Sequence, residues 1–193
     1  MVATFINYTL KGILWYQGES NAGNPAEYKK LLPALIADWR SKWGLGLLPL
    51  LYVQLPNFMD YNYQPSESQW AELRESQLNA LSVPNTAMAV AIDLGEWNDL
   101  HPDNKKDIGI RLALAALNLA YHENIEYSGP LFDTAVISGK QIIISFTHIG
   151  SGLTNNDGEP PTEFAIAGDI GISAIARLLG DQVQTQVDIV TRG

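Results

Sequence analysis

The sequence predicts an α/β protein built on a parallel sheet, and three features of the chain lead to this prediction. Short apolar runs alternate with longer segments whose apolar residues recur at steps of three and four, as strands alternating with helices do. The chain has 193 residues, 46% hydrophobic and 17% charged, which is a globular composition and excludes a disordered or fibrous protein. It contains no cysteine, which excludes disulfides and thiolate metal sites. Together these features favour a sheet with helices on both faces.

Three apolar runs are the predicted strands of this sheet. They cover residues 12–16, 47–55 and 86–94. Each run is short and largely apolar, which is typical of a strand that is covered on both faces. The carboxyl ends of parallel strands are where ligand chemistry is expected.

Three predicted helices connect and follow these strands. They cover residues 26–43, 70–81 and 102–121. The first lies between Asn24, an expected N-cap, and Gly44, an expected C-cap. Its apolar stripe consists of Tyr28, Leu31, Leu32, Leu35, Ile36 and Trp39. In the second helix, Arg74 and Gln77 lie off the apolar stripe and favour a structural clamp.

The pattern changes beyond the third helix. Residues 134–137 and 140–146 have the signature of a β-hairpin. Residues 150–161 are rich in Gly, Asn and Pro and are typical of an exposed loop. We therefore predict two parts, an α/β part at residues 1–126 and a β-rich segment at residues 127–193.

The charge balance limits the partners that this chain is expected to bind. Twelve Lys and Arg stand against 21 Asp and Glu, which gives a formal net charge of −9. The basic clusters are no longer than the pairs Lys29-Lys30 and Lys105-Lys106, so we expect no nucleic-acid or membrane partner. No apolar run approaches the roughly 20 residues that a membrane helix needs.

Two of the predicted strand ends carry polar clusters with the residue types of a hydrolytic site. One reads WYQGESNA at residues 15–22, and the other reads DLGEWNDLHP at residues 93–102. A glycine after a buried strand exposes backbone N–H groups of the kind that stabilise an oxyanion. His101 stands before a helix with carboxylates upstream, as a general base and its orienting acid do.

These clusters, with three further segments, resemble the sialate O-acetylesterases, carbohydrate esterases of the SGNH hydrolase superfamily. The segments read KGILWYQGESNA, ADWRSKWG, LPLLYVQLPNF, WAELRESQ and DLGEWNDLHPDNK, within a resemblance that covers residues 7–168. The resemblance implies a three-layer α/β/α, flavodoxin-like fold. It also implies removal of acetyl groups from a sugar or glycan through a serine nucleophile, with no metal or other cofactor. Such enzymes are commonly exported, so a full-length protein is expected to be secreted or periplasmic.

The resemblance assigns catalytic roles to individual positions. His101 matches the general base, and Gln17 and Gly18 match the loop that faces the oxyanion. The superfamily pattern has an Asp three residues before the His, where this chain has Asn98. Asp99 lies two residues before it, so either Asp99 or a backbone carbonyl orients the imidazole.

Five further residues are candidates for contact with the sugar. Glu19 and Asn21 belong to the same loop as Gly18, and Trp97 precedes His101. Tyr61 and Tyr63 follow the second strand, where aromatic rings could serve as a platform for a sugar.

The nucleophile of this family is expected before the first predicted strand. Residues 1–10 contain no serine, and Ser20 lacks the second glycine of a G-x-S-x-G elbow and is more typical of a turn. We therefore expect residues 1–126 to be the C-terminal part of an SGNH-type esterase domain that lacks its first strand and nucleophile, and to be inactive alone. A sheet edge left unpaired in this way favours a homodimer.

Two other functions stay open. One is a non-catalytic carbohydrate-binding α/β module, in which the aromatic residues named above bind a glycan without acyl chemistry. The other is a metallohydrolase that uses Asp93, Glu96, Asp99 and His101. A single histidine with no second one at ligand spacing makes this a poor divalent-metal site.

Overall fold

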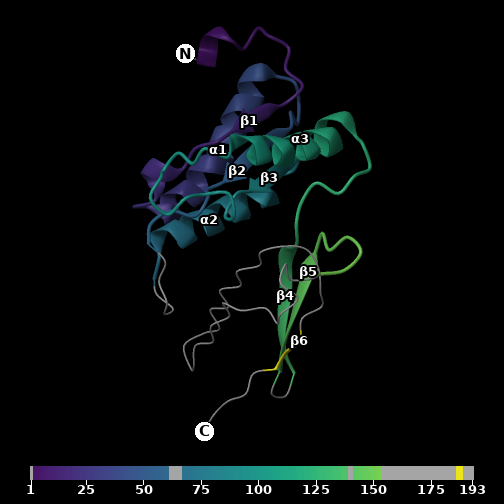
Figure 1. Ribbon diagram of the computed structural model, residues 1–193. Helices are drawn as coiled ribbons and strands as arrows, with labels where there is room; N and C mark the ends of the chain where they lie inside the picture. Colours follow the sequence, from purple (N-terminus) through teal and green to yellow (C-terminus); the bar gives the residue numbers. More distant parts are fainter. Residues whose placement is uncertain (1, 61–66, 139–140, 154–185, 189–193) are drawn as a thin grey trace. The chain divides into compact units, whose positions relative to one another are not determined.

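The computed structural model divides the chain into two compact units, Met1–Tyr127 and Ser128–Gly193 (Figure 1). The residues that the structure describes are 2–60, 67–138, 141–153 and 186–188. Within them, none of the helices combines the length and the apolar character that crossing a membrane would require.

The first unit is built on a parallel sheet of three strands. They are β1 (Ile13–Trp15), β2 (Leu50–Gln54) and β3 (Thr86–Val90), in the order β1-β2-β3. Tyr52, in the middle of β2, lies opposite Trp15 at the end of β1 on one side and opposite Met88 in the middle of β3 on the other. The predicted α/β class is confirmed, with strands shorter than the apolar runs that predicted them.

Three α-helices pack on this sheet. They are α1 (Pro25–Trp43), α2 (Gln69–Asn79) and α3 (Lys105–Tyr121), with short 3₁₀ turns at Val2–Thr4, Glu19–Asn21 and Ala80–Ser82. The side chain of Asn24 accepts a hydrogen bond from the N–H of Glu27, and Gly44 ends α1 with a φ of 64°, as predicted. We expected the third helix to open at Pro102. It begins at Lys105, because the side chain of Asn104 caps it.

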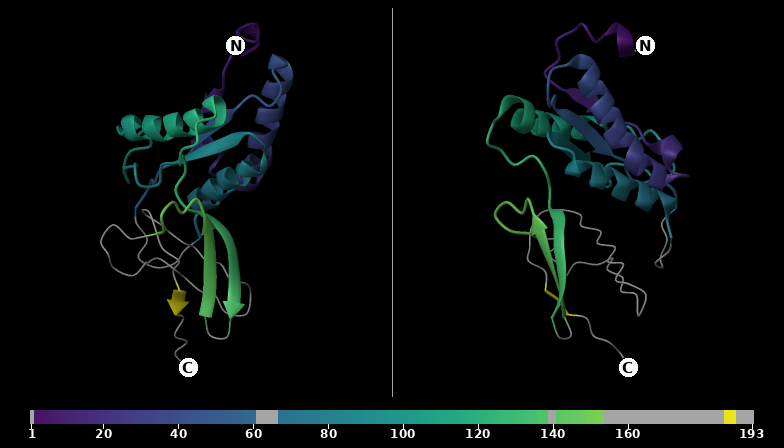
Figure 2. Two further views of the ribbon diagram at one scale, coloured as in Figure 1. Left: turned by 90° about the vertical axis from the view of Figure 1, so that its right-hand side faces the viewer. Right: turned by 180° about the vertical axis from the view of Figure 1, so that it is seen from behind.

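The helices form one layer on each face of the sheet (Figure 2). Leu50 and Tyr52 of β2 belong to the core shared with α1 and α2, whereas Leu51 and Val53 belong to the core shared with α3. Leu14 of β1 is 62% exposed, which corrects the expectation that the first strand is covered on both faces. The reason is that β1 is an edge strand while α3 packs on β2 and β3. Self-association through the β1 edge stays a prediction.

The second unit contains the predicted hairpin. Its strands are β4 (Leu131–Ser138) and β5 (Gln141–Thr147), which pair antiparallel, and β6 (Gln186–Asp188) pairs antiparallel with β5. An irregularity lies between Phe132 and Thr134. The antiparallel pair after the α/β part is confirmed.

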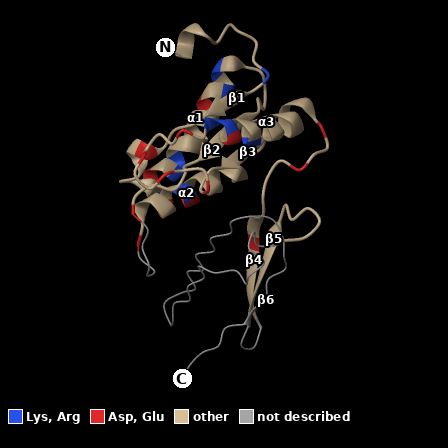
Figure 3. Ribbon diagram, in the orientation of Figure 1, with Lys and Arg blue, Asp and Glu red and all other residues tan. Residues whose placement is uncertain are grey.

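Charges are mixed along the surface helices of the first unit. Figure 3 shows basic and acidic residues interspersed on α1 and α2. The exposed pair Lys42 and Asp38, one turn apart on α1, is an example of this mixing.

Candidate active site

Both polar clusters follow the carboxyl ends of parallel strands. The first begins after Trp15, where β1 ends, and the second begins after Val90, where β3 ends. Because the strands are parallel, both loops leave the same edge of the sheet. The ammonium of Lys105, at the start of α3, lies 5.7 Å from the centroid of the Tyr16 ring. This contact brings the segment that follows His101 to the end of β1.

The loop after β1 is tied together by its own side chains. The amide of Gln17 donates to Oδ1 of Asn21 at 2.9 Å. The backbone N–H of Gly18 donates to Oε2 of Glu19, also at 2.9 Å. The four predicted residues of this loop are therefore assembled in one place, with a negatively charged oxygen held by the Gly18 N–H.

Gly18 is buried, and its neighbours leave little room for a side chain. A Cβ at this position would lie 3.1 Å from Nε2 of Gln77 and 3.3 Å from Cδ1 of Leu55. A larger residue would push the loop away from α2 and from the end of β2. The close approach explains why glycine stands here.

Gln77 is the clamp that holds the ends of two strands. It is 1% exposed, and its amide nitrogen donates to the carbonyls of Gln17 at 3.4 Å and Val53 at 3.3 Å. Its Oε1 accepts from the N–H of Leu55 at 2.9 Å. The structural clamp expected in the second helix is therefore present at Gln77. This side chain holds the loop that carries Gly18.

Tyr28 is a second support of this loop, and sequence reasoning did not find it. Its hydroxyl donates to the carbonyl of Gln17 at 2.9 Å and accepts from Nε1 of Trp15 at 3.4 Å. Burial raises the pKa of the Tyr28 hydroxyl above its ordinary value, so the group stays protonated and able to donate. In the sequence, Tyr28 is one member of the α1 stripe, and the pattern does not reveal what its hydroxyl binds.

The loop after β3 is fixed by an ion pair and by close packing. Asp93 accepts two hydrogen bonds from the guanidinium of Arg111, both at 2.6 Å, and Arg111 also donates to the carbonyl of Val90 at 2.6 Å. The hydrogen bonds from Arg111 lower the pKa of the Asp93 carboxyl below its usual value. Asp93 therefore anchors the loop to α3.

Gly95 lies directly against the segment that follows β2. A Cβ at this position would lie 2.4 Å from the backbone oxygen and from Oδ1 of Asn57. Next to this contact, the N–H of Met59 donates to the carbonyl of Trp97 at 2.8 Å. Among the described residues, Oδ1 of Asn57 is buried without a hydrogen-bond partner. The loop that leads to His101 is thereby held on the end of β2.

His101 is exposed at the end of this loop. Its backbone N–H donates to Oδ1 of Asp99 at 2.7 Å, so this carboxylate shapes the turn that presents the histidine. Which group orients the imidazole stays a prediction. Trp97 is 60% exposed, and Tyr61 and Tyr63 lie outside the described residues.

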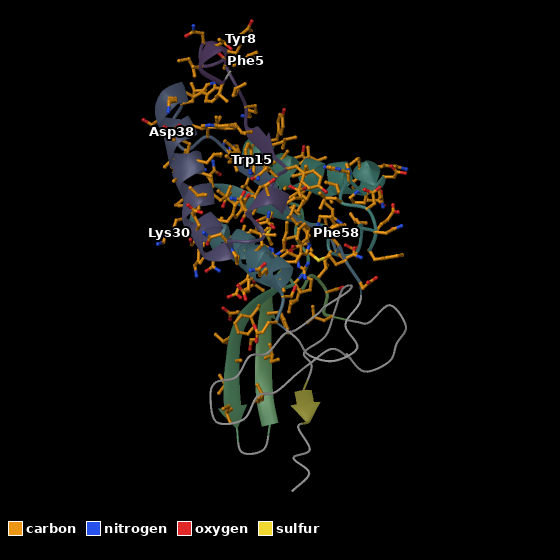
Figure 4. All side chains as sticks on the ribbon, turned by 90° about the vertical axis from the view of Figure 1, so that its left-hand side faces the viewer. Phe5, Tyr8, Trp15, Lys30, Asp38 and Phe58 are labelled. Atoms are coloured by element: carbon orange, nitrogen blue, oxygen red, sulfur yellow. The ribbon has the colours of Figure 1, made fainter. Side chains whose placement is uncertain are left out.

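A cavity of about 470 Å³ borders the loop after β1. It runs along α1 and is mainly apolar, and its lining includes Trp15, Gln17, Asn21, Tyr28 and Asp38. Figure 4 labels Trp15 and Asp38, which belong to β1 and α1. A hollow of this size is in the range of small-molecule sites.

In the part of the chain that the structure describes, no group of three His, Asp or Glu side chains gathers as a metal-ligand set. Asp93, one of the four residues of the metallohydrolase alternative, is bound to Arg111. The arrangement is that of an α/β protein with a polar site at the carboxyl edge of a parallel sheet, a class that includes many hydrolases.

Comparison with known proteins identifies the family within this class. Residues 1–118 match the family described as carbohydrate esterase, sialic acid-specific acetylesterase, and the chain belongs to this family. The resemblance seen in the sequence is thus confirmed.

Mammalian and bacterial esterases are among the proteins that are similar to this chain. The chain is 37% identical over 150 residues to the sialate O-acetylesterase of Mus musculus, an alignment that covers 68% of this chain and 27% of that protein. It is 34% identical over 167 residues to the sialate O-acetylesterase of Homo sapiens, covering 77% and 32% respectively. A carbohydrate acetylesterase of Xanthomonas citri has a similar structure, with a TM-score of 0.81 and 39% identity over 95% of this chain and 45% of that one. The chain therefore spans less than a third of the length of the Mus musculus and Homo sapiens proteins.

Proposed function

We propose that this chain carries the general base and the oxyanion loop of a carbohydrate O-acetylesterase, which hydrolyses acetyl esters on a sugar or glycan. The observation that carries the proposal is the hydrogen bond from Gly18 to Glu19. At the end of β1, a backbone N–H holds a negatively charged oxygen at 2.9 Å. An oxyanion hole requires a donor at about this distance, 2.7–3.1 Å, from the developing charge.

In the proposed reaction, the imidazole of His101 takes the proton of a serine hydroxyl as the serine oxygen attacks the acetyl carbonyl. The carbonyl electron pair moves onto its oxygen, which the N–H of Gly18 and the amide of Gln17 stabilise. When the electron pair returns, the bond to the sugar oxygen breaks and His101 gives that oxygen the proton. A water molecule repeats the sequence on the acetyl-serine and releases acetate.

Without substrate, the carboxylate of Glu19 accepts the hydrogen bond of the Gly18 N–H. The acetyl carbonyl of the substrate must take its place, so we propose that Glu19 moves toward the sugar when substrate binds. Asn21, Trp97, Tyr61 and Tyr63 are the other residues proposed to contact the sugar. Support for Trp97 comes from its exposed ring, which is free to stack on a sugar face.

We propose that the serine nucleophile is not among these 193 residues. Ser20 lies in the 3₁₀ turn Glu19–Asn21 directly after Gly18, and no G-x-S-x-G elbow surrounds it. A fluorophosphonate probe labels only a serine that a neighbouring base activates. We expect no mass shift when the 193-residue chain is treated, and one label per molecule when the full-length protein is treated. A label on Ser20 of this chain would contradict the proposal.

The role of His101 is tested in the full-length protein. The substitution His101→Ala is expected to lower kcat/KM for an acetylated sugar by about 10³-fold or more, because the general base is lost. The matched control is His122→Asn, since His122 is exposed at the end of α3 with a φ of 62°, a conformation that asparagine also adopts. Full activity in His101→Ala would overturn the proposal. Calorimetric binding of plain and acetylated sugars without any turnover would favour the carbohydrate-binding module.

A further inference from the structure

The Gln17–Gly18 peptide bond is held from both of its sides. The carbonyl oxygen of Gln17 and the N–H of Gly18 belong to the same peptide unit and point in opposite directions, because the unit is planar and trans. The carbonyl accepts from the Tyr28 hydroxyl at 2.9 Å and from the Gln77 amide at 3.4 Å. The N–H faces the other way, toward the Glu19 carboxylate.

We infer that Tyr28 is a positioning residue for the esterase reaction, because its hydroxyl holds the carbonyl of the peptide whose N–H would stabilise the oxyanion. The inference rests on the function proposed above. Tyr28 does not touch the reacting atoms. It acts through the peptide plane, whose rotation would turn the Gly18 N–H away from the substrate.

The support is rigid because it comes from the interior of the first unit. The Tyr28 side chain is 3% exposed and belongs to the core that α1 and α2 share with the sheet. Its hydroxyl in turn accepts from Nε1 of Trp15, the last residue of β1. The strand that carries the loop therefore also fixes the group that orients the loop.

The same arrangement strengthens the Gly18 N–H as a donor. Trp15, Tyr28 and the Gln17–Gly18 peptide form a chain of hydrogen bonds that runs in one direction. Hydrogen bonds in series polarise one another, so a peptide whose carbonyl accepts a bond has a more acidic N–H. Orientation and polarisation both act where negative charge appears in the transition state.

Tyr28 tests this inference more cleanly than Gln77 does. The Gln77 amide also makes hydrogen bonds with the backbone of Val53 and Leu55, so its removal disturbs β2 as well as the loop. The substitution Tyr28→Phe removes a hydroxyl and keeps the ring. The matched control is Tyr52→Phe, which removes a buried hydroxyl that donates to the backbone carbonyl of Gln77 at 2.8 Å, outside the Gln17–Gly18 peptide.

The first experiment compares both variants in the full-length protein with an acetylated sugar as substrate. Removal of an oxyanion donor costs about 10²–10³-fold in kcat, so misorientation of one is expected to cost about 10-fold in Tyr28→Phe. We expect KM to stay within about 2-fold, because the oxyanion exists in the transition state and not in the bound substrate. Tyr52→Phe is expected to lower the melting temperature as much as Tyr28→Phe while keeping kcat.

The second experiment needs no activity. In the 193-residue chain labelled with ¹⁵N-glycine, Tyr28→Phe is expected to move the Gly18 amide proton upfield, because its peptide is less polarised. Tyr52→Phe is expected to leave that signal in place. Trp15→Phe removes the N–H that donates to the Tyr28 hydroxyl. It is expected to shift the Gly18 amide signal less, and to lower kcat of the full-length protein by about 2-fold.

Each outcome bears on one proposal at a time. Equal kcat in Tyr28→Phe and Tyr52→Phe, in a protein that still depends on His101, overturns the positioning role alone. An unmoved Gly18 amide signal in Tyr28→Phe does the same. Esterase activity that does not depend on His101 overturns the proposed function instead.

Discussion

The loops after β1 and β3 leave the same edge of the sheet but are held in different ways. Buried groups of α1 and α2, the Tyr28 hydroxyl and the Gln77 amide, hold the loop that carries Gly18. The loop that carries His101 is held by the partly exposed Asp93–Arg111 ion pair and by the contact of Gly95 with the segment after β2. The loop that carries Gly18 is therefore held by groups of the core, whereas the position of the loop that carries His101 depends on a few local contacts.

The contact between Gly95 and Asn57 is expected to matter most for stability. Gly95→Ala would place a Cβ 2.4 Å from backbone and side-chain oxygens of Asn57, so the two segments must separate. We expect a loss of about 3 kcal/mol in the free energy of unfolding, measured by urea denaturation. The matched control is Gly109→Ala in α3, where a Cβ meets nothing within 4 Å and should stabilise the helix by about 0.5–1 kcal/mol. Equal stability of the two variants would contradict the contact.

Removal of the buried clamp is expected to have the next largest effect. Gln77→Leu leaves the Leu55 N–H without its partner and weakens the hold on Gln17. A buried polar group that loses its partner costs about 1–3 kcal/mol, so we expect urea denaturation to give a loss of about 2 kcal/mol. Gln69→Leu, at an exposed position at the start of α2, is the control and is expected to change stability by less than about 0.5 kcal/mol. A harmless Gln77→Leu would show that the β1 loop is not held from the core.

The ion pair of the β3 loop is expected to have the smallest effect and a characteristic dependence on pH. Arg111 lowers the pKa of Asp93 in the folded chain, so the pair stabilises the fold above the unfolded pKa of Asp, about 3.9. This stabilisation is lost as the pH falls through the lower, folded pKa. Because the pair is about a third exposed, Asp93→Asn is expected to cost only about 0.5 kcal/mol at neutral pH and nothing in strong acid. A cost that does not change with pH would argue against the ion pair.

Features that depend on neighbours in the sequence could be predicted. Asn24 and Gly44 mark the ends of α1 because capping uses atoms within a few residues. The alternation of apolar runs with amphipathic segments gave the α/β class for the same reason. The helix after β3 was predicted three residues too early, because Pro102 and Asn104 both carry start signals and the side chain of Asn104 makes the cap.

Features that depend on tertiary contacts could not be predicted. The sequence shows that Tyr28 is apolar-facing, but its hydroxyl partner, Gln17, becomes visible only once α1 packs on β1. The same holds for Gln77, which is 60 residues from Gln17 along the chain. The exposure of Leu14 follows from the position of β1 at the edge of the sheet, which its apolar run does not reveal.

The end of β2 supports both loops. Leu55 lies against Gly18 and is bound to Gln77, and two residues further on Asn57 lies against Gly95. A single local opening of this segment would therefore free both the loop that carries Gly18 and the loop that carries His101 from the end of β2. In hydrogen-exchange terms the two loops belong to one cooperative unit, so their amides should become accessible at a common rate set by the fraying of β2.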